Sequence, residues 1–279
     1  MTYKTILVQL NDEQRVERTL QPAVMLAARM GAHLIGLHVS PGLMYVPPLP
    51  SASNIIGMIR EHEHRICDKI GNAFEEMTRN RGFVAEMRFL KPRGHDDLYE
   101  LVMQHARSAD LVVASQPAPL TDVSGILDFP ERLAIECGRP VLTVPLSGAR
   151  SEIGKHVLIA WNGKREAARA TFDALPLLKA ARTVTVLGLE QVRSAGNDLP
   201  LPDTAIGASL ARHGVNVTVQ TASAKETSVG EAILARVAGE GADLLVMGAY
   251  GHMRLREFVF GGATRHVVRH MTVPTLFAH

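Results

Sequence analysis

Short apolar runs alternate with segments of helical periodicity along the chain. In the second half, continuous Val, Ile and Leu runs predict strands near residues 155–161, 183–189, 215–220, 243–248 and 273–278. Apolar positions at three- and four-residue spacing predict helices near residues 165–180, 203–213, 227–240 and 262–270. Strands that are apolar throughout and separated by helices are typical of a parallel sheet covered on both faces. Right-handed crossovers then give a doubly wound α/β fold.

The first half of the chain follows the same plan, because three of its segments recur in the second half in the same order. The matching pairs are residues 4–11 with 155–162, 109–113 with 242–246, and 139–144 with 273–278. The polar, glycine-containing segment between the two copies reads as a linker. We therefore predict two tandem domains, residues 1–146 and 155–279.

Composition and charge exclude several classes of protein. The 279 residues are 46% hydrophobic and 21% charged, which is ordinary for a globular chain. Aromatic residues make up only 5%, and 30 Lys and Arg face 28 Asp and Glu, so we expect no nucleic-acid partner. Cys67 and Cys137 lack the spacing of a metal-ligand pair or a disulfide framework. Neither a signal peptide nor a membrane-length apolar run is present, and we expect a cytoplasmic protein without a membrane partner.

The most informative segment is a glycine-rich loop between the predicted strand at 243–248 and the last helix. It contains Gly248 and Gly251, then Gly261 and Gly262 at the start of that helix, with Thr264 in the first turn. Ligands of open α/β sheets bind beyond the carboxyl ends of strands, and a glycine backbone at a helix start favours phosphate. The alternative is that these glycines serve only tight turns. Four arginines against one acid between residues 252 and 270 also favour an anion.

The loop differs from two common nucleotide motifs. No Gly-Lys-Ser/Thr follows it, so it is not a Walker loop. The first strand of the second half is followed by Asn162, Gly163 and Lys164, which lack the dinucleotide fingerprint.

The pattern Gly-x2-Gly-x9-Gly followed by a small residue, after the fourth strand of a five-strand unit, resembles the universal stress protein family. The duplication resembles the tandem, UspA-like members of that family. The resemblance implies strand order 3-2-1-4-5 in each domain and a pseudo-dimer within one chain. It also implies ATP as ligand, with an accompanying Mg²⁺ left open, and no catalytic residue. Carried over by position, the implied site residues are Asn162 in place of the usual Asp, Leu189 at adenine, and Gly248, Gly251, Gly261, Gly262 and Thr264 at the phosphates.

The first half lacks the motif. With a constant offset of 133, Gly248, Gly251 and Gly261 align with Ser115, Ala118 and Asp128. Asp128 would place a carboxylate where the phosphates of a nucleotide would lie, and two negative charges so close together repel each other. We therefore predict that the first half does not bind ATP in the family's manner and acts as a scaffold or interaction domain.

Histidine pairs suggest metal chemistry but lack its spacing. His62 and His64 are two residues apart on a helix, so their rings diverge, and we predict no metal site there. His266 and His270 are four residues apart and would share a helix face, where we expect them to serve as cations near the helix end.

The sequence therefore predicts an ATP-binding module of stress response or signalling, with the nucleotide in the C-terminal half and at most slow hydrolysis. One alternative is a nucleotide-independent scaffold, since the apolar last strands of the halves, residues 140–144 and 273–277, are expected to pair within the chain or in a homodimer. The other is an enzyme of a related adenine-nucleotide α/β fold, for which Lys164 or His252 would have to supply the catalytic group.

Overall fold

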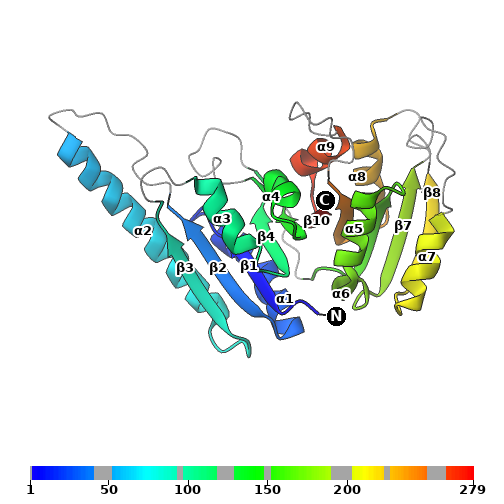
Figure 1. Cartoon of the computed structure of the whole chain (residues 1–279), viewed down its shortest axis with the longest axis horizontal. Coiled ribbons are helices and arrows are strands. Elements are labelled where there is room, and N and C mark those ends of the chain that lie inside the picture. Colours follow the sequence, from blue (N-terminus) through cyan, green and yellow to red (C-terminus); the bar gives the residue numbers. More distant parts are fainter. Residues whose placement is uncertain are drawn as a thin grey trace. The chain divides into compact units, whose positions relative to one another are not determined.

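The computed structural model describes residues 2–40, 52–92, 97–117, 129–147, 152–189, 203–222, 227–249 and 262–279. Contacts divide the chain into two compact units, Tyr3–Phe129 and Pro130–His279, the second together with Met1–Thr2 (Figure 1). Each unit contains mostly parallel strands with helices packed against them.

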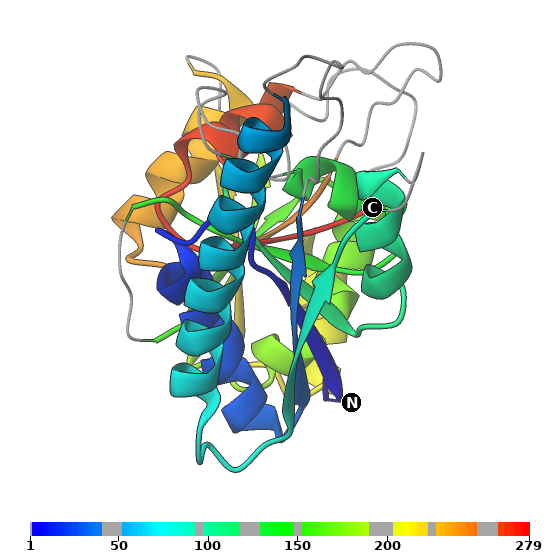
Figure 2. The same ribbon diagram turned by 90° about the vertical axis from the view of Figure 1, so that its left-hand side faces the viewer.

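The first unit holds four parallel strands in the order β3-β2-β1-β4. The strands are β1 (Thr5–Gln9), β2 (His33–Val39), β3 (Ala85–Leu90) and β4 (Leu111–Ser115). The helices are α1 (Val16–Met30), α2 (Ala52–Thr78) and α3 (Leu98–Ala106). Figure 2 shows the long helix α2 running along this layer.

Neighbouring residues of β3 show which helix covers which face of the first layer. Met87 lies beside Gly36, where the ring of Phe74 from α2 also packs. The next residue, Arg88, instead contacts His105 of α3 through its Nη1, at 3.0 Å from His105 Nδ1. Because successive strand residues point to opposite faces, α2 and α3 lie on opposite sides of the sheet.

The second unit has six strands in the order β5-β10-β9-β6-β7-β8. They are β5 (Val141–Val144), β6 (His156–Trp161), β7 (Thr183–Leu189), β8 (Val217–Ala222), β9 (Leu244–Gly248) and β10 (Thr275–Ala278). The helices are α4 (Pro130–Glu136), α5 (Arg165–Asp173), α6 (Leu175–Leu178), α7 (Asp203–Arg212), α8 (Val229–Gly239) and α9 (Gly262–His270). Counted from β6, its five parallel strands have the expected order 3-2-1-4-5.

Strand β5 comes from the first sequence repeat but lies in the second compact unit. It pairs antiparallel with β10, and Leu142 faces Leu276. The expected pairing of the two last strands is therefore present within the chain. The contacts divide the chain at Phe129, whereas the repeat boundary near residues 147–154 is a property of the sequence and stays a prediction.

The helix predicted over residues 165–180 was wrong as one helix, because the structure divides it into α5 and α6 at Ala174. Pro176 is the physical reason. Its ring nitrogen has no N–H to donate to the carbonyl four residues earlier, and its ring crowds that carbonyl. The apolar periodicity continues through the break because both short helices bury the same face.

Two equivalent registers show that the repeats correspond position by position. Ile6 of β1 pairs with Leu111 of β4, and Val157 of β6 pairs with Leu244 of β9. The offsets of 151 (157 − 6) and 133 (244 − 111) are those of the sequence repeat. Residues of the two halves can therefore be compared directly. Among the described residues, no helix is long and apolar enough to cross a membrane.

Candidate functional site

The switch point of the second sheet lies between β6 and β9. These strands are neighbours, and the chain leaves β6 toward β7 on one side and β9 toward β10 on the other. Ligands of open α/β sheets bind at the carboxyl ends of such a strand pair. The residues that follow Trp161 and Gly248 therefore form the candidate site.

Asn162 is exposed directly after β6. Its side-chain Oδ1 accepts a hydrogen bond from the Lys164 main-chain N–H at 3.0 Å, and Gly163 adopts a left-handed φ of +74°. This Asx turn directs the chain from the strand into α5. Within the described part of the chain, the Asn162 Nδ2 group makes no hydrogen bond, which leaves an amide donor for a ligand.

Gly248 is held in a close backbone contact. A Cβ on Gly248 would lie 2.5 Å from the carbonyl carbon of Glu166 and 2.6 Å from the nitrogen of Ala167. The first turn of α5 therefore packs directly on the end of β9, which requires glycine there. Its predicted role at a phosphate stays a prediction beside this packing role.

The other site residues lie at the same carboxyl edge of the sheet. Leu189 is buried at the end of β7. Gly262 is exposed at the start of α9, and a Cβ there would meet no atom within 4 Å. Thr264 is buried in the first turn of that helix. Gly251 and Gly261 lie outside the described residues.

Sequence reasoning missed three side chains at this edge. Arg165 Nε donates to Glu166 Oε1 at 2.7 Å, and Arg165 Nη2 lies 3.4 Å from His279 Nε2. His279 Nδ1 lies 2.8 Å from the carbonyl oxygen of Ala249, the residue that follows β9. The adjacent opposite charges of Arg165 and Glu166 at a helix start were visible in the sequence. The contact with His279 was not, because His279 is far from them in the chain.

Burial of Glu166 by itself would raise the pKa of its carboxyl. The hydrogen bond from Arg165 and a backbone hydrogen bond outweigh burial, with a smaller contribution from the charge of Arg165. The net pKa is therefore below the usual range of a glutamate, and the carboxylate is ionised at neutral pH.

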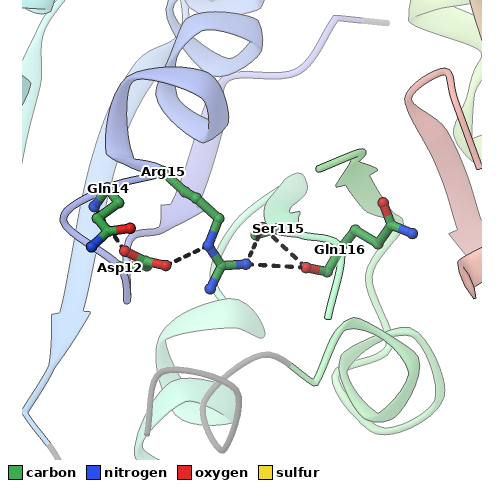
Figure 3. A network of polar contacts seen from close by, with 5 residues as sticks. All are labelled: Asp12, Gln14, Arg15, Ser115 and Gln116. Atoms are coloured by element: carbon green, nitrogen blue, oxygen red, sulfur yellow. Dashed lines mark hydrogen bonds and ion pairs between the residues drawn. The ribbon is translucent and has the colours of Figure 1, made fainter. Parts of the chain in front are cut away.

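The first repeat has a different arrangement at the equivalent place (Figure 3). Ser115, the counterpart of Gly248, carries a Cβ where Gly248 has no room for one. Arg15, which aligns with Glu166 (166 − 15 = 151), extends from the start of α1 to the end of β4. Its Nη1 donates to Ser115 Oγ at 3.3 Å and to the Gln116 carbonyl at 3.4 Å, while its Nε bonds Asp12. A guanidinium thus occupies the switch point of the first sheet. Ala118 and Asp128 lie outside the described residues.

The histidine pairs lie on the helices α2 and α9. His62 and His64 are exposed on α2. The rings of His266 and His270 stack on one face of α9 with centroids 4.3 Å apart. Across the ranges that the structure describes, no group of three or more His, Cys, Asp and Glu is placed to hold a metal ion.

Comparison with known proteins identifies the family. Residues 154–279 match the model of the universal stress protein family. The chain belongs to the universal stress protein family. No curated protein matches the sequence.

Two solved structures share the fold over nearly the whole chain. A universal stress protein from Archaeoglobus fulgidus DSM 4304 is 16% identical, covers 98% of this chain and 95% of its own, and gives a TM-score of 0.68. A functionally unknown protein from Pseudomonas aeruginosa PAO1 is 14% identical, covers 99% of this chain and 92% of its own, and gives a TM-score of 0.58. A universal stress protein from Archaeoglobus fulgidus in complex with dAMP is 19% identical, covers 52% of this chain and 99% of its own, and gives a TM-score of 0.34. At these identities the first two structures show the fold and leave the ligand to the site residues.

Proposed function

We propose that the second repeat of this universal stress protein binds ATP and that the chain is a nucleotide-binding module of stress response or signalling in the cytoplasm. The observation that carries the proposal is the position of the glycine segment. It leaves β9 at the switch point with β6 and leads into α9, within the part of the chain that matches the family.

The described residues fit a nucleotide. The surroundings of Gly262 are open, and the first N–H groups of α9 have no carbonyl of their own helix to bond, so a phosphate can approach them. Asn162 offers an amide donor at the end of β6, where the family resemblance implies contact with the nucleoside. Leu189 offers its main chain at the end of β7. Gly251 and Gly261 complete the proposed set, and Mg²⁺ would arrive with the phosphates of ATP.

Binding is favoured over rapid hydrolysis. Water attack on the terminal phosphate needs a positioned base or a positioned water. Glu166, a carboxylate at this edge of the sheet, is ion-paired with Arg165 and buried. We therefore propose at most slow hydrolysis, and any signal would come from occupancy of the site.

We propose that the first repeat does not share this function. Arg15 bridges the start of α1 and the end of β4, and Ser115 replaces the glycine on which the close packing in the second repeat depends. A scaffold or interaction role for this repeat, including self-association of the whole chain, is part of the proposal.

The test is a calorimetric ATP titration of the wild-type chain and of Gly262→Asp. The new carboxylate lies at the start of α9, where it is favourable for the helix dipole but repels phosphate. We expect wild-type binding at millimolar ATP or below, and at least about a tenfold loss in the variant with an unchanged melting temperature. The control for ATP affinity is Gly239→Asp, because Gly239 is also an exposed helical glycine without neighbours within 4 Å. Absence of wild-type binding at millimolar ATP would overturn the proposal.

A further inference from the structure

Arg165 is an exposed cation that two neighbouring groups hold in place. Its side chain is 80% exposed, and it begins α5 directly after the turn at Asn162. One N–H of its guanidinium donates to Glu166 and one to His279. A guanidinium has five N–H donors, and within the described part of the chain the other three make no hydrogen bond.

Glu166 is the buried half of this ion pair. Its side chain is only 8% exposed, which costs free energy for a carboxylate unless hydrogen bonds and a counter-charge compensate. Arg165 supplies both, and the lowered pKa of Glu166 keeps the negative charge in place at neutral pH. Glu166 therefore acts as a fixed anchor that restricts where the guanidinium can lie.

His279 supplies the second anchor and defines its own tautomer. A carbonyl oxygen only accepts, so Nδ1 carries the proton that it donates to the Ala249 carbonyl at 2.8 Å. In the neutral ring Nε2 then presents a lone pair, which accepts from Arg165 Nη2. One imidazole thus joins the entry of the glycine segment to the first residue of α5, on the two sides of the switch point.

We propose that Arg165 is a phosphate-contacting residue that sets the preference of this site for nucleotides with more phosphate groups, and that His279 positions it. The inference rests on the proposed nucleotide site and names what that site selects. A planar guanidinium with unused donors matches phosphate oxygens in geometry and charge. The two anchors have already restricted its conformation, so less entropy is lost when a phosphate binds. A nucleoside monophosphate would gain less binding free energy from the Arg165 guanidinium than a triphosphate would.

The experiment measures the affinities of ATP and AMP for the wild type, Arg165→Gln and Arg169→Gln. Arg169 is a matched control, because it lies one turn later on α5, is exposed and is ion-paired with Asp173. We expect Arg165→Gln to weaken ATP binding about tenfold or more and AMP binding by less than about threefold. Arg169→Gln should leave both unchanged. Equal losses for ATP and AMP, or no loss, in Arg165→Gln would overturn the inference while the proposed function stands. Lack of any wild-type nucleotide binding would overturn both.

The role of His279 has its own readout. We expect His279→Ala to lower the ratio of ATP to AMP affinity by less than Arg165→Gln does, while AMP affinity stays within about twofold. Arg165→Lys keeps the charge but cannot bond both anchors, so it should retain part of the ATP preference. An unchanged ratio in His279→Ala would remove His279 from the assignment and leave Arg165 in it.

Discussion

The carboxylate of Asp243 accepts hydrogen bonds from the main-chain N–H of Lys155 at 3.0 and 3.1 Å. It also accepts from Gly154 at 2.8 Å and from His156 at 3.2 Å. Asp110 does the same in the first repeat, where it accepts from Lys4 at 2.7 Å and Thr5 at 3.0 Å. Each repeat thus ties the start of its first strand to the residue that precedes its fourth strand.

This relationship predicts a graded effect of removing the charge. Asp243→Asn should lower the free energy of unfolding by about 1–3 kcal/mol, because the new NH₂ group faces donors that need an acceptor. Asp110→Asn should cost less, because Asp110 accepts fewer bonds and is only half-buried. Urea unfolding followed by circular dichroism and by the fluorescence of Trp161, the single tryptophan, measures both. A larger cost for Asp110→Asn would contradict this account.

The close contact of Gly248 predicts a loss of stability that does not depend on ligand. Gly248→Ala places a methyl group 2.5 Å from the Glu166 carbonyl carbon and 2.6 Å from the Ala167 nitrogen, and we expect a cost of about 1–3 kcal/mol. Gly262→Ala is the matched control, since its methyl group meets no neighbour and alanine favours a helix by up to about 1 kcal/mol. Thermal unfolding without nucleotide compares the two variants. Equal melting temperatures would mean that the contact at Gly248 can relax.

The Arg15 bridge predicts an effect on the first repeat alone. Arg15→Ala should destabilise it by about 1–2 kcal/mol, because Asp12 loses its counter-charge and Ser115 loses a donor. ATP affinity should stay unchanged, since the proposed site lies in the second repeat. Arg18→Ala, an exposed arginine on the same helix, is the control. Urea unfolding and ATP titration of both variants test this, and a lost ATP affinity in Arg15→Ala would argue for a ligand in the first repeat.

Stability should depend on pH through His38. Burial lowers the pKa of His38 more than its hydrogen bond to the Leu10 carbonyl and the charge of Glu63 raise it. The folded protein therefore binds a proton less readily than the unfolded chain. The stabilisation is complete above the unfolded pKa, about 6.5, and is lost as pH falls below it toward the lowered folded value.

The measurement is the free energy of unfolding at pH 7.5 and 5.5. His38→Gln should lose less stability between these two values than the wild type does. His62→Gln changes an exposed histidine and should keep the wild-type difference. Some dependence should remain in both variants, because burial and the charge of Arg88 lower the pKa of His105 in the same direction. An identical pH dependence in His38→Gln and wild type would refute the assignment.

Much of the second sheet could be predicted from local pattern. The strands expected near residues 155–161 and 183–189 are His156–Trp161 and Thr183–Leu189. Apolar runs are local, and a strand buried on both faces must be apolar throughout, so the pattern identifies it. The broken helix at Ala174 shows the limit of periodicity, because a proline interrupts hydrogen bonding without changing the apolar spacing.

The sequence by itself determined the duplication, the α/β class and the place of the glycine segment after a fourth strand. These features follow from repeated sequence segments and from the periodicity of apolar residues. Only the tertiary structure decided that the expected pairing of β5 with β10 forms within the chain, that Gly248 lies against the backbone of α5, and that His279 meets Arg165. Each of these depends on the register between segments far apart in the chain. Periodicity predicts the elements, whereas packing determines which side chains of different elements meet.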